Sequence, residues 1–139
     1  DVCSSDLQIK IQKYLVVHDC GKVINPLILD GQIHGGVAQG IGNAFYEHLK
    51  YDENGQLLNG TFMDYHLPTS LEVPRIETGH GETLSPLNPM GVKGAGEAGA
   101  IPVGPLFAQA LEDALYDSNF EILEIPINSN RLWEIVSGK

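Results

Sequence analysis

The chain has 139 residues, which is enough for one domain that buries about two thirds of its unfolded surface. Its 18 acidic and 8 basic residues give a net charge of -10, which excludes nucleic acid and anionic membranes as partners, because both bind lysine and arginine. No apolar stretch approaches the ~20 residues of a membrane span, and no signal peptide is visible, so we expect a soluble, cytoplasmic protein.

The first seven residues, Asp1 to Leu7, are unusual for the start of a domain. They equal the in-frame translation of the end of a common sequencing adapter. We therefore expect residues 1–7 to be an artefact without substantial buried contacts, and residues 8–139 to form the domain. On this interpretation the natural chain is a fragment of a longer protein that began further upstream.

The spacing of apolar residues predicts one mixed α/β (α+β) unit without repeats or linkers. In chain order we expect a strand over 9–17, a helix over 26–50, a tight turn at Asn54–Gly55, strands over 57–65 and 76–80, an irregular segment over 81–104, a helix over 103–115, a strand over 121–125 and a last helix. Asn128 or Ser129 caps this last helix, and Leu132, Trp133 and Val136 are expected in the core.

Two cysteines, Cys3 and Cys20, are too few for a disulfide framework and lack the spacing of a metal site. Cys20 follows an apolar run, which predicts a buried free thiol. The five histidines show no metal-type spacing either, so we expect no metal ion held by protein side chains.

The helix expected over 26–50 is rich in glycine, which lowers helix stability by roughly 1 kcal/mol per residue relative to alanine. Its glycines are Gly31, Gly35, Gly36, Gly40 and Gly42. On a helical projection Gln32, Gln39 and Asn43 form a stripe of amides with glycines on both sides. This stripe fits a flat, hydrogen-bonding ligand, but glycines at this spacing are also typical of two closely packed elements.

A second glycine-rich segment, PMGVKGAGEAG over 89–99, contains a single carboxylate, Glu97. Glycines let backbone N–H groups approach a ligand, and a following helix N-terminus favours anions. Glu97 is therefore either a solvated surface acid or a carboxylate presented to a ligand, and the pattern alone leaves both interpretations open. The segment lacks the Gly-Lys-Ser/Thr end of a P-loop and the preceding strand of a dinucleotide-binding fingerprint.

Four segments together resemble the second molybdopterin-binding domain of the xanthine dehydrogenase/aldehyde oxidase family, the molybdenum hydroxylases. They are DCGKVINP (19–26), GQIHGGVAQGIG (31–42), FMDY (62–65) and NPMGVKGAGEAG (88–99). The resemblance runs from about Ile9 to Val136 and is greatest to the bacterial branch that includes the aerobic carbon monoxide dehydrogenases. It implies a C-terminal fragment of the molybdopterin-binding large subunit.

By this resemblance Glu97 matches the glutamate that stands beside the molybdenum and acts as the general base, a role that typically contributes 10²–10⁴-fold in rate. Gln32 matches a glutamine that hydrogen-bonds the pterin. The further cofactor contacts that the resemblance implies are Gly35, Gly36, Gln39, Lys93, Gly94, Ala95 and Gly96. In this family water supplies the oxygen of the product, while the metal and its pterin carry the redox chemistry.

The resemblance also implies a molybdopterin-dependent oxidoreductase that acts on an aldehyde, a purine, an N-heterocycle or carbon monoxide. The expected cofactor is molybdenum–molybdopterin in its cytosine dinucleotide form. The expected partners are the remainder of the large subunit and the subunits that carry [2Fe–2S] clusters and FAD, in a dimer of heterotrimers, so the isolated fragment is expected to be inactive. Neither Cys3 nor Cys20 matches the copper-binding cysteine of carbon monoxide dehydrogenase, so copper use is open.

One alternative from another functional class is a non-catalytic acidic module whose glycine-rich loop binds a phosphate ligand. That module needs a preceding strand and a basic anchor, for which Lys93 is the candidate. A second alternative is a family member that has lost catalysis, and the presence of Glu97 in an intact loop disfavours it.

Overall fold

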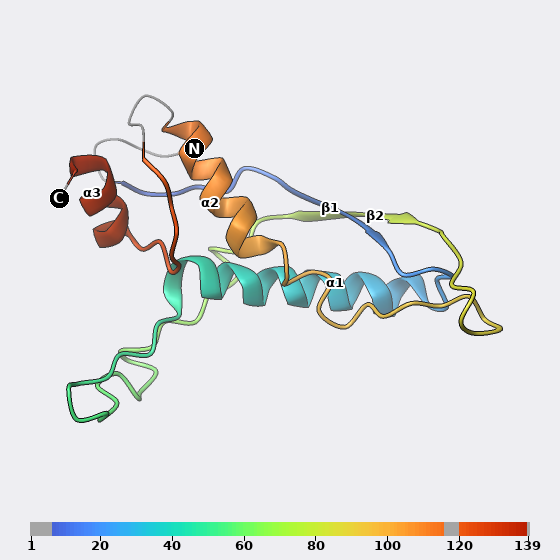
Figure 1. Cartoon of the computed structure of the whole chain (residues 1–139), viewed down its shortest axis with the longest axis horizontal. Helices are drawn as coiled ribbons and strands as arrows, with labels where there is room; N and C mark the ends of the chain where they lie inside the picture. Colours follow the sequence, from blue (N-terminus) through green and yellow to red (C-terminus); the bar gives the residue numbers. More distant parts are fainter. Residues whose placement is uncertain (1–6, 116–119, 139) are drawn as a thin grey trace.

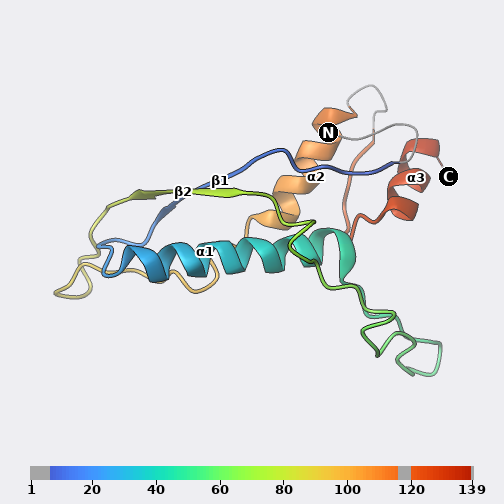
Figure 2. The same cartoon turned by 180° about the vertical axis from the view of Figure 1, so that it is seen from behind.

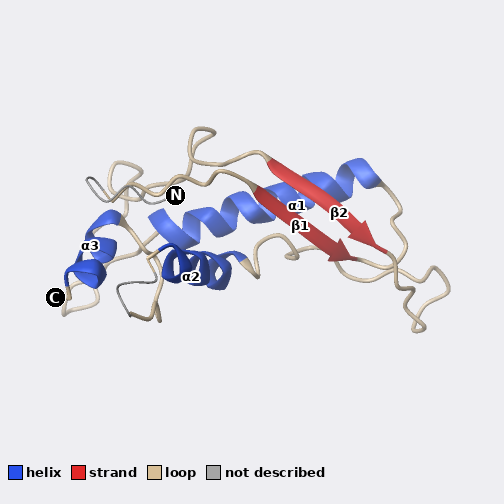
Figure 3. Cartoon of the chain, turned by 90° about the horizontal axis from the view of Figure 1, so that it is seen from above, coloured by secondary structure: helices blue, strands red, loops and turns tan. Residues whose placement is uncertain are grey.

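Two parallel strands, β1 (Tyr14–Asp19) and β2 (Ile76–Gly81), pair along their whole length in this computed structural model. The structure describes residues 7–115 and 120–138. Parallel strands need a long crossover, which here contains the helix α1 (Pro26–Ile41). Figures 1 and 3 show α1 along one face of the strand pair, so this part of the chain is a βαβ unit of a mixed α/β fold, as expected.

The first strand differs from its expected boundaries more than the second strand does. The first strand was expected over 9–17, but it begins at Tyr14 and continues to Asp19. The expected strand over 76–80 is confirmed and is one residue longer. Cys20, which directly follows β1, is buried and free, as expected.

Helix α1 begins with two local signals. The side-chain oxygen of Asn25 accepts a hydrogen bond from the Ile28 N–H at 3.2 Å, and Pro26 occupies the first turn. The residues that the helix buries against the strands and the following elements are Leu29, Ile33, Val37, Gly40 and Ile41. Their spacing of three to four residues is the apolar period that predicted the helix.

The helix does not continue to Lys50 as expected. After Ile41 the chain forms a π-helical turn, η1 (Gly42–Tyr46), in which the Glu47 N–H donates to the Gly42 carbonyl at 2.8 Å. The Glu47 carboxylate occupies the space where a side chain at residue 42 would lie. A larger residue at position 42 would therefore displace the Glu47 side chain at the point where the helix widens and ends.

The helix α2 (Val103–Ala114) crosses α1 and completes the core (Figure 1). The Phe107 ring lies with its centroid 5.8 Å from that of Tyr14 and 4.7 Å from that of Phe45. A Cβ atom on Gly40 would lie 2.5 Å from Val103 Cγ2, so this glycine allows the two helices to approach closely.

Between η1 and β2 the chain leaves the body as an arm, residues 47–75 (Figures 1 and 2). The expected turn is confirmed: the Gly55 N–H donates to the Asp52 carbonyl at 3.0 Å, and Gly55 has a φ of 81°. Large apolar side chains of the arm are exposed, among them Phe62 and Met63, which are 85% and 94% exposed.

The strand expected over 57–65 is wrong. The Asn59 side chain donates to the His48 carbonyl at 2.5 Å and accepts from the Lys50 N–H at 2.7 Å, so it replaces the backbone ladder that a strand would need. The backbone pairing between the two sides of the arm is limited to an isolated bridge of Tyr51 and Leu57 within the described residues.

The strand expected over 121–125 is also wrong. The Ile122 N–H donates to the Glu112 carboxylate at 2.6 Å, so a helix side chain takes the place of a neighbouring strand. Ile122 and Ile127 are nevertheless buried in the core.

The last helix is α3 (Ser129–Ser137), with Asn128 as the cap that accepts from the Arg131 N–H at 2.9 Å. Leu132 is fully buried, but Trp133, which was expected in the core, is 47% exposed. Within the described part of the chain, no helix is long and apolar enough to cross a membrane.

The assignment of residues 1–7 to an artefact stays a prediction. Residues 1–6 lie outside the described residues. Leu7 is partly buried and packs against the core, which differs from the expected lack of contact at this position.

Candidate functional site

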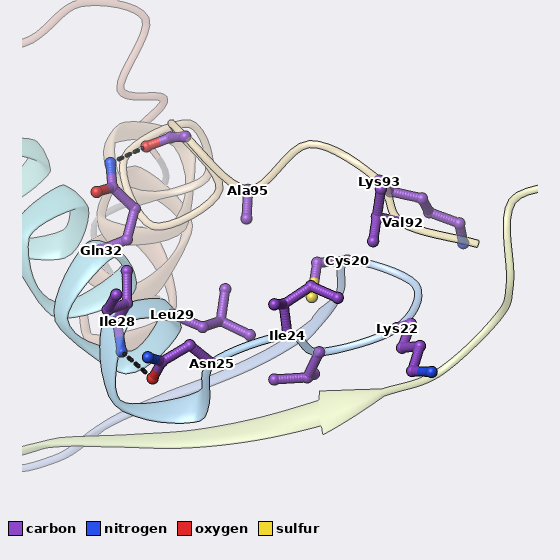
Figure 4. Close-up of a pocket in the computed structure, with 12 residues that line it drawn as sticks. Cys20, Lys22, Ile24, Asn25, Ile28, Leu29, Gln32, Val92, Lys93 and Ala95 are labelled. Atoms are coloured by element: carbon purple, nitrogen blue, oxygen red, sulfur yellow. Dashed lines mark hydrogen bonds between the residues drawn. The ribbon is translucent and has the colours of Figure 1, made fainter. Parts of the chain in front are cut away.

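The two glycine-rich segments of the sequence meet in space. The side-chain amide of Gln32 on α1 donates through Nε2 to the carbonyl of Gly96 at 2.7 Å, across 64 positions of sequence. Figure 4 shows this bond, with the amide oxygen of Gln32 on the side away from Gly96. Gln32 therefore lies beside the segment that contains Glu97, because Gly96 directly precedes that residue.

The glycine-rich loop, residues 89–99, is held to the turn after β1 by backbone contacts. The Lys93 N–H donates to the Cys20 carbonyl at 2.7 Å, and the Lys22 N–H donates to the Gly91 carbonyl at 3.2 Å. Gly21, which forms an isolated bridge with Val92, has a φ of 67°, a left-handed conformation that favours glycine. The loop therefore follows the DCGK turn closely.

The glycines of the two segments divide into two groups. Cβ atoms on Gly36, Gly40 or Gly99 would meet protein atoms, for example the Ala100 nitrogen at 2.9 Å from residue 36. Those on Gly31, Gly35, Gly94 and Gly96 would meet nothing within 4 Å. Close packing explains why the first group must be glycine. It does not explain the second group, whose backbone is left open to solvent or to a ligand.

The bare glycines and the amides form one surface, which we call the open face. It consists of Gln32, Gly35, Gln39, Gly94 and Gly96, all of which are exposed. Gln39 lies about two helical turns after Gln32 and therefore on the same side of α1. Gly36 is half-buried, and a Cβ atom at this position would meet the backbone of Gly99 and Ala100. Its expected contact with the cofactor stays a prediction.

A cavity of about 380 Å³ adjoins the open face (Figure 4). Three segments supply its lining: the turn after β1, the first turns of α1 and the glycine-rich loop. The lining includes Cys20, Ile24, Ile28, Gln32, Ala95 and Gly96. Most of this wall is apolar, with the Gln32 amide at one end, which suits a flat ligand that has polar edges.

The sequence prediction named Gln32, Lys93, Ala95 and Gly96 but missed the apolar wall made by Ile24 and Ile28. A signal for this wall was present. Ile28 lies four residues before Gln32, on the same helical face, and it is 68% exposed, although a large apolar side chain at the start of a helix usually packs inward.

Glu97 has an exposed side chain. Its carbonyl accepts from the Ala100 N–H at 2.9 Å and from the Ile101 N–H at 3.1 Å. Glu97 thus begins a turn that leads into α2 at Val103, and it directly follows the bonded Gly96. The Glu97 side chain is not buried in the protein, and the residue adjoins Gly96 of the open face in the sequence.

Lys93 is already paired within the protein. Its ammonium Nζ lies 3.1 Å from Asp19 Oδ2. Hydrogen bonds from Thr83, first its side chain, then from the Gly21 N–H hold the pKa of Asp19 well below its usual range, so this carboxylate stays charged at neutral pH. The basic anchor that was named for the phosphate-binding alternative is therefore already paired with Asp19.

A second carboxylate joins α1 to β2. Asp30 Oδ1 accepts from Thr78 Oγ1 at 2.7 Å and lies 3.0 Å from His80 Nε2. The hydrogen bond from Thr78, followed by that from His80, lowers the pKa of Asp30. This contact fixes α1 against the strands and so fixes the side of the helix that forms the open face.

Comparison with known proteins identifies the class. The family model of the molybdopterin cofactor-binding domain matches residues 2–74. The chain is 38% identical over 126 residues to the carbon monoxide dehydrogenase large chain of Afipia carboxidovorans, which covers 91% of this chain and 16% of the relative. It is 40% identical over 130 residues to the nicotine 6-hydroxylase large subunit of Paenarthrobacter nicotinovorans, with coverages of 94% and 16%.

The fold has close counterparts among solved structures. Quinoline 2-oxidoreductase from Pseudomonas putida 86 superposes with a TM-score of 0.94 at 40% identity, over 99% of this chain and 18% of that one. The fold and these matches define a molybdopterin cofactor-binding domain. The chain belongs to the molybdenum hydroxylases of the xanthine dehydrogenase family and is similar to their carbon monoxide dehydrogenase-like members. It spans about one sixth of the length of these relatives.

The residues of the open face fit such a cofactor. Gly35, Gly94 and Gly96 leave space where any side chain would stand, and the Gln32 amide oxygen can accept from a pterin N–H. The apolar wall of the cavity suits the face of a ring system. Lys93 also lines the cavity, and its ammonium bonds Asp19.

Proposed function

We propose that this chain is the part of a molybdenum hydroxylase that binds the molybdopterin on its open face and supplies Glu97 as the general base. The reaction adds an oxygen from water to an aldehyde, an N-heterocycle, a purine or carbon monoxide. When bound, the cofactor supplies the metal-centred redox chemistry that takes electrons from the substrate. The observation that carries the proposal is the Gln32–Gly96 hydrogen bond, which joins the amide stripe to the loop of Glu97.

Each residue of the site has a separate task. Gln32, with its Nε2 bound to Gly96, is oriented so that its oxygen can bind a pterin edge. Gly35, Gly94 and Gly96 let the cofactor approach the backbone. The exposed carboxylate of Glu97 accepts the proton of the attacking water-derived oxygen through one of its Oε atoms, because an ionised carboxylate is a pure acceptor.

The names of the relatives support the N-heterocycle among the four substrate classes. One relative is named as a nicotine hydroxylase and another as a quinoline oxidoreductase. Relatives named as carbon monoxide and xanthine dehydrogenases keep the other classes in the proposal. A panel of one substrate from each class, assayed with an artificial electron acceptor, distinguishes them through kcat/KM.

The proposal extends to the assembly. It includes the cytosine dinucleotide form of the cofactor, the remainder of the large subunit, subunits with [2Fe–2S] clusters and FAD, a dimer of heterotrimers and a cytoplasmic location. Relatives named as large chains and large subunits support partner subunits. The phosphate-binding alternative has less support, because its basic anchor, Lys93, is paired with Asp19.

The test is Glu97→Gln in the whole enzyme, with molybdenum content and steady-state kinetics as readouts. Glutamine keeps the size and the hydrogen bonds but cannot accept the proton, so we expect full molybdenum and a kcat lowered by about 10²-fold or more, or roughly 2.7 kcal/mol of barrier. The loss in kcat should be at least as large as the loss in kcat/KM.

Glu53→Gln is the matched control, because Glu53 is an exposed glutamate on the arm. We expect this control variant to keep the wild-type kcat. Full molybdenum occupancy with a near-wild-type kcat in Glu97→Gln would remove Glu97 from the reaction. Loss of molybdenum in that variant would instead make Glu97 a cofactor-retaining residue.

A further inference from the structure

One charged side chain joins three segments beside the open face. Asp19, the last residue of β1, accepts through Oδ1 from the Gly21 N–H at 2.7 Å and from the Thr83 N–H at 3.2 Å. Its Oδ2 lies 3.1 Å from the ammonium of Lys93 in the glycine-rich loop. The turn after β1, the chain after β2 and the glycine-rich loop therefore share one carboxylate.

Both the backbone and the side chain of Lys93 bond other residues. Its backbone N–H donates to the Cys20 carbonyl at 2.7 Å, and its side chain reaches Asp19. The side chains of Asp19 and Lys93 are only 32% and 36% exposed, so the pair is partly shielded from water. In Figure 4 the ammonium points to the opposite side of the cavity from Gln32 and therefore away from the open face.

The part of the loop after Lys93 needs such an anchor. Gly94 and Gly96 lack a side chain that could pack, and a glycine backbone has more accessible conformations than that of any other residue. The next contact that holds the loop is the hydrogen bond from Gln32 Nε2 to the Gly96 carbonyl, at 2.7 Å. Glu97 follows directly, and its position therefore depends on a short glycine segment that is fixed at Lys93 and at Gly96.

We infer that Asp19 and Lys93 are positioning residues, which fix the glycine-rich loop so that Gly96 meets Gln32 and Glu97 reaches the reacting atoms. The part of this inference that concerns catalysis rests on the proposed function of the site. The part that concerns the loop rests on the contacts alone. Lys93 acts here through Asp19 and the loop, and it does not bind the cofactor.

The first experiment measures amide hydrogen exchange in the 139-residue chain. Lys93→Met removes the ammonium but keeps the apolar stem, so the loop should open more often. We expect the Ala100 and Ile101 amides, which donate to the Glu97 carbonyl, to exchange on the order of fivefold faster, the upper range for a partly exposed ion pair. The Gln32 side-chain amide resonance should move as its bond to Gly96 weakens.

Two matched variants complete the first experiment. Lys93→Arg keeps the charge and should restore both the exchange rates and the resonance. Lys22→Met removes an exposed lysine from the same cavity and should change neither. The Val37 amide, in the core helix, is the internal reference for global stability in every variant. Unchanged exchange at Ala100 and Ile101 in Lys93→Met would overturn the inference.

The second experiment uses the whole enzyme. We expect Lys93→Met to keep its molybdenum, to lose about fivefold in kcat with little change in KM, and to be rescued by Lys93→Arg. Loss of molybdenum with unchanged exchange would make Lys93 a cofactor ligand and overturn the inference. A wild-type kcat in Lys93→Met, while Glu97→Gln is inactive, would overturn the positioning role.

The failure of the proposed function gives a different result. In that case Lys93→Met speeds loop exchange as expected, but both Lys93→Met and Glu97→Gln keep full molybdenum and a near-wild-type kcat. This result would support the contact between Asp19 and the loop and would contradict the catalytic role of Glu97.

Discussion

The glycines of α1 and of the glycine-rich loop show how one residue type serves two purposes within a few positions. Gly36 and Gly40 lie where a methyl group would enter the neighbouring loop or Val103. Gly35, one position away, faces open space and is exposed. The sequence pattern could not separate these two uses, because both need small residues at helical spacing.

This division leads to opposite expectations for two neighbouring substitutions. Gly36→Ala places a Cβ 2.9 Å from the Ala100 nitrogen, so we expect the free energy of unfolding to fall by about 1–3 kcal/mol. Gly35→Ala meets no atom and gains helix propensity, so we expect it to rise by up to about 1 kcal/mol. Urea unfolding of the two variants measures both changes.

The same pair tests the open face in the whole enzyme. If the cofactor lies on Gly35, as we propose, Gly35→Ala should lower the molybdenum content although it stabilises the fold. A more stable Gly35→Ala variant with full molybdenum would place the cofactor elsewhere, and an unstable one would show that the space at residue 35 is not free.

Among the elements, the helices could be predicted more completely than the strands. Their apolar period depends on local sequence, and the caps at Asn25 and Asn128 are visible as short polar side chains before an apolar run. The strands expected over 57–65 and 121–125 failed because a strand needs a partner. In both places a side chain, Asn59 or Glu112, takes the hydrogen bonds instead.

The candidate site could be predicted only in part, because some of its contacts join residues that are far apart in the sequence. The resemblance to the family assigned Gln32 and the glycine-rich loop to one cofactor, and the hydrogen bond between Gln32 and Gly96 shows that these two segments meet. The pairing of Lys93 with Asp19, across 74 positions of sequence, has no local pattern. Long-range pairs of charges follow from the fold and could not be read from spacing.

Asn59 is the residue on which the arm depends. It is only 9% exposed, and its amide bonds both the His48 carbonyl and the Lys50 N–H. Asn59→Ala removes both hydrogen bonds, each worth about 0.5–1.5 kcal/mol net, because the two backbone groups belong to exposed residues that water can reach. We expect proteolytic cleavage within residues 47–75 to become several times faster.

The rest of the fold should tolerate this change, because the arm lies outside the core of α1 and α2 (Figures 1 and 2). Asp52→Ala, which also lies on the arm, is a matched comparison that removes the bonds to the backbone of Asn54 and Gln56. Equal cleavage rates in wild-type and Asn59→Ala protein would show that the arm closes without Asn59.

At the scale of the whole molecule, the fold presents surfaces that a folded protein normally covers. The outer face of β1 exposes Leu15 and Val17, at 58% and 73%. Parallel sheets are usually covered on both faces, and two strands alone are marginal. The arm adds Phe62 and Met63 to the exposed apolar surface. These surfaces are consistent with a domain that packs against other parts of a larger enzyme, as we propose.

The candidate site is exposed in the same way as these apolar surfaces. The open face, which we propose binds the cofactor, lies on the surface of the chain, and both Gln32 and Glu97 are exposed. A misplacement of about 1 Å in an active site can cost 10²-fold in rate. We therefore expect the purified 139-residue chain to show no turnover of an aldehyde, a purine, an N-heterocycle or carbon monoxide with an artificial electron acceptor. Co-expression with the remainder of a related large subunit and its partner subunits, in a host that makes the cofactor, should restore both molybdenum content and turnover, and Glu97→Gln in that assembly should remove turnover only. Turnover by the chain alone would show that a single wall is enough to hold the cofactor and to orient the substrate, because no second domain would then be needed to exclude water or to position the reacting carbon.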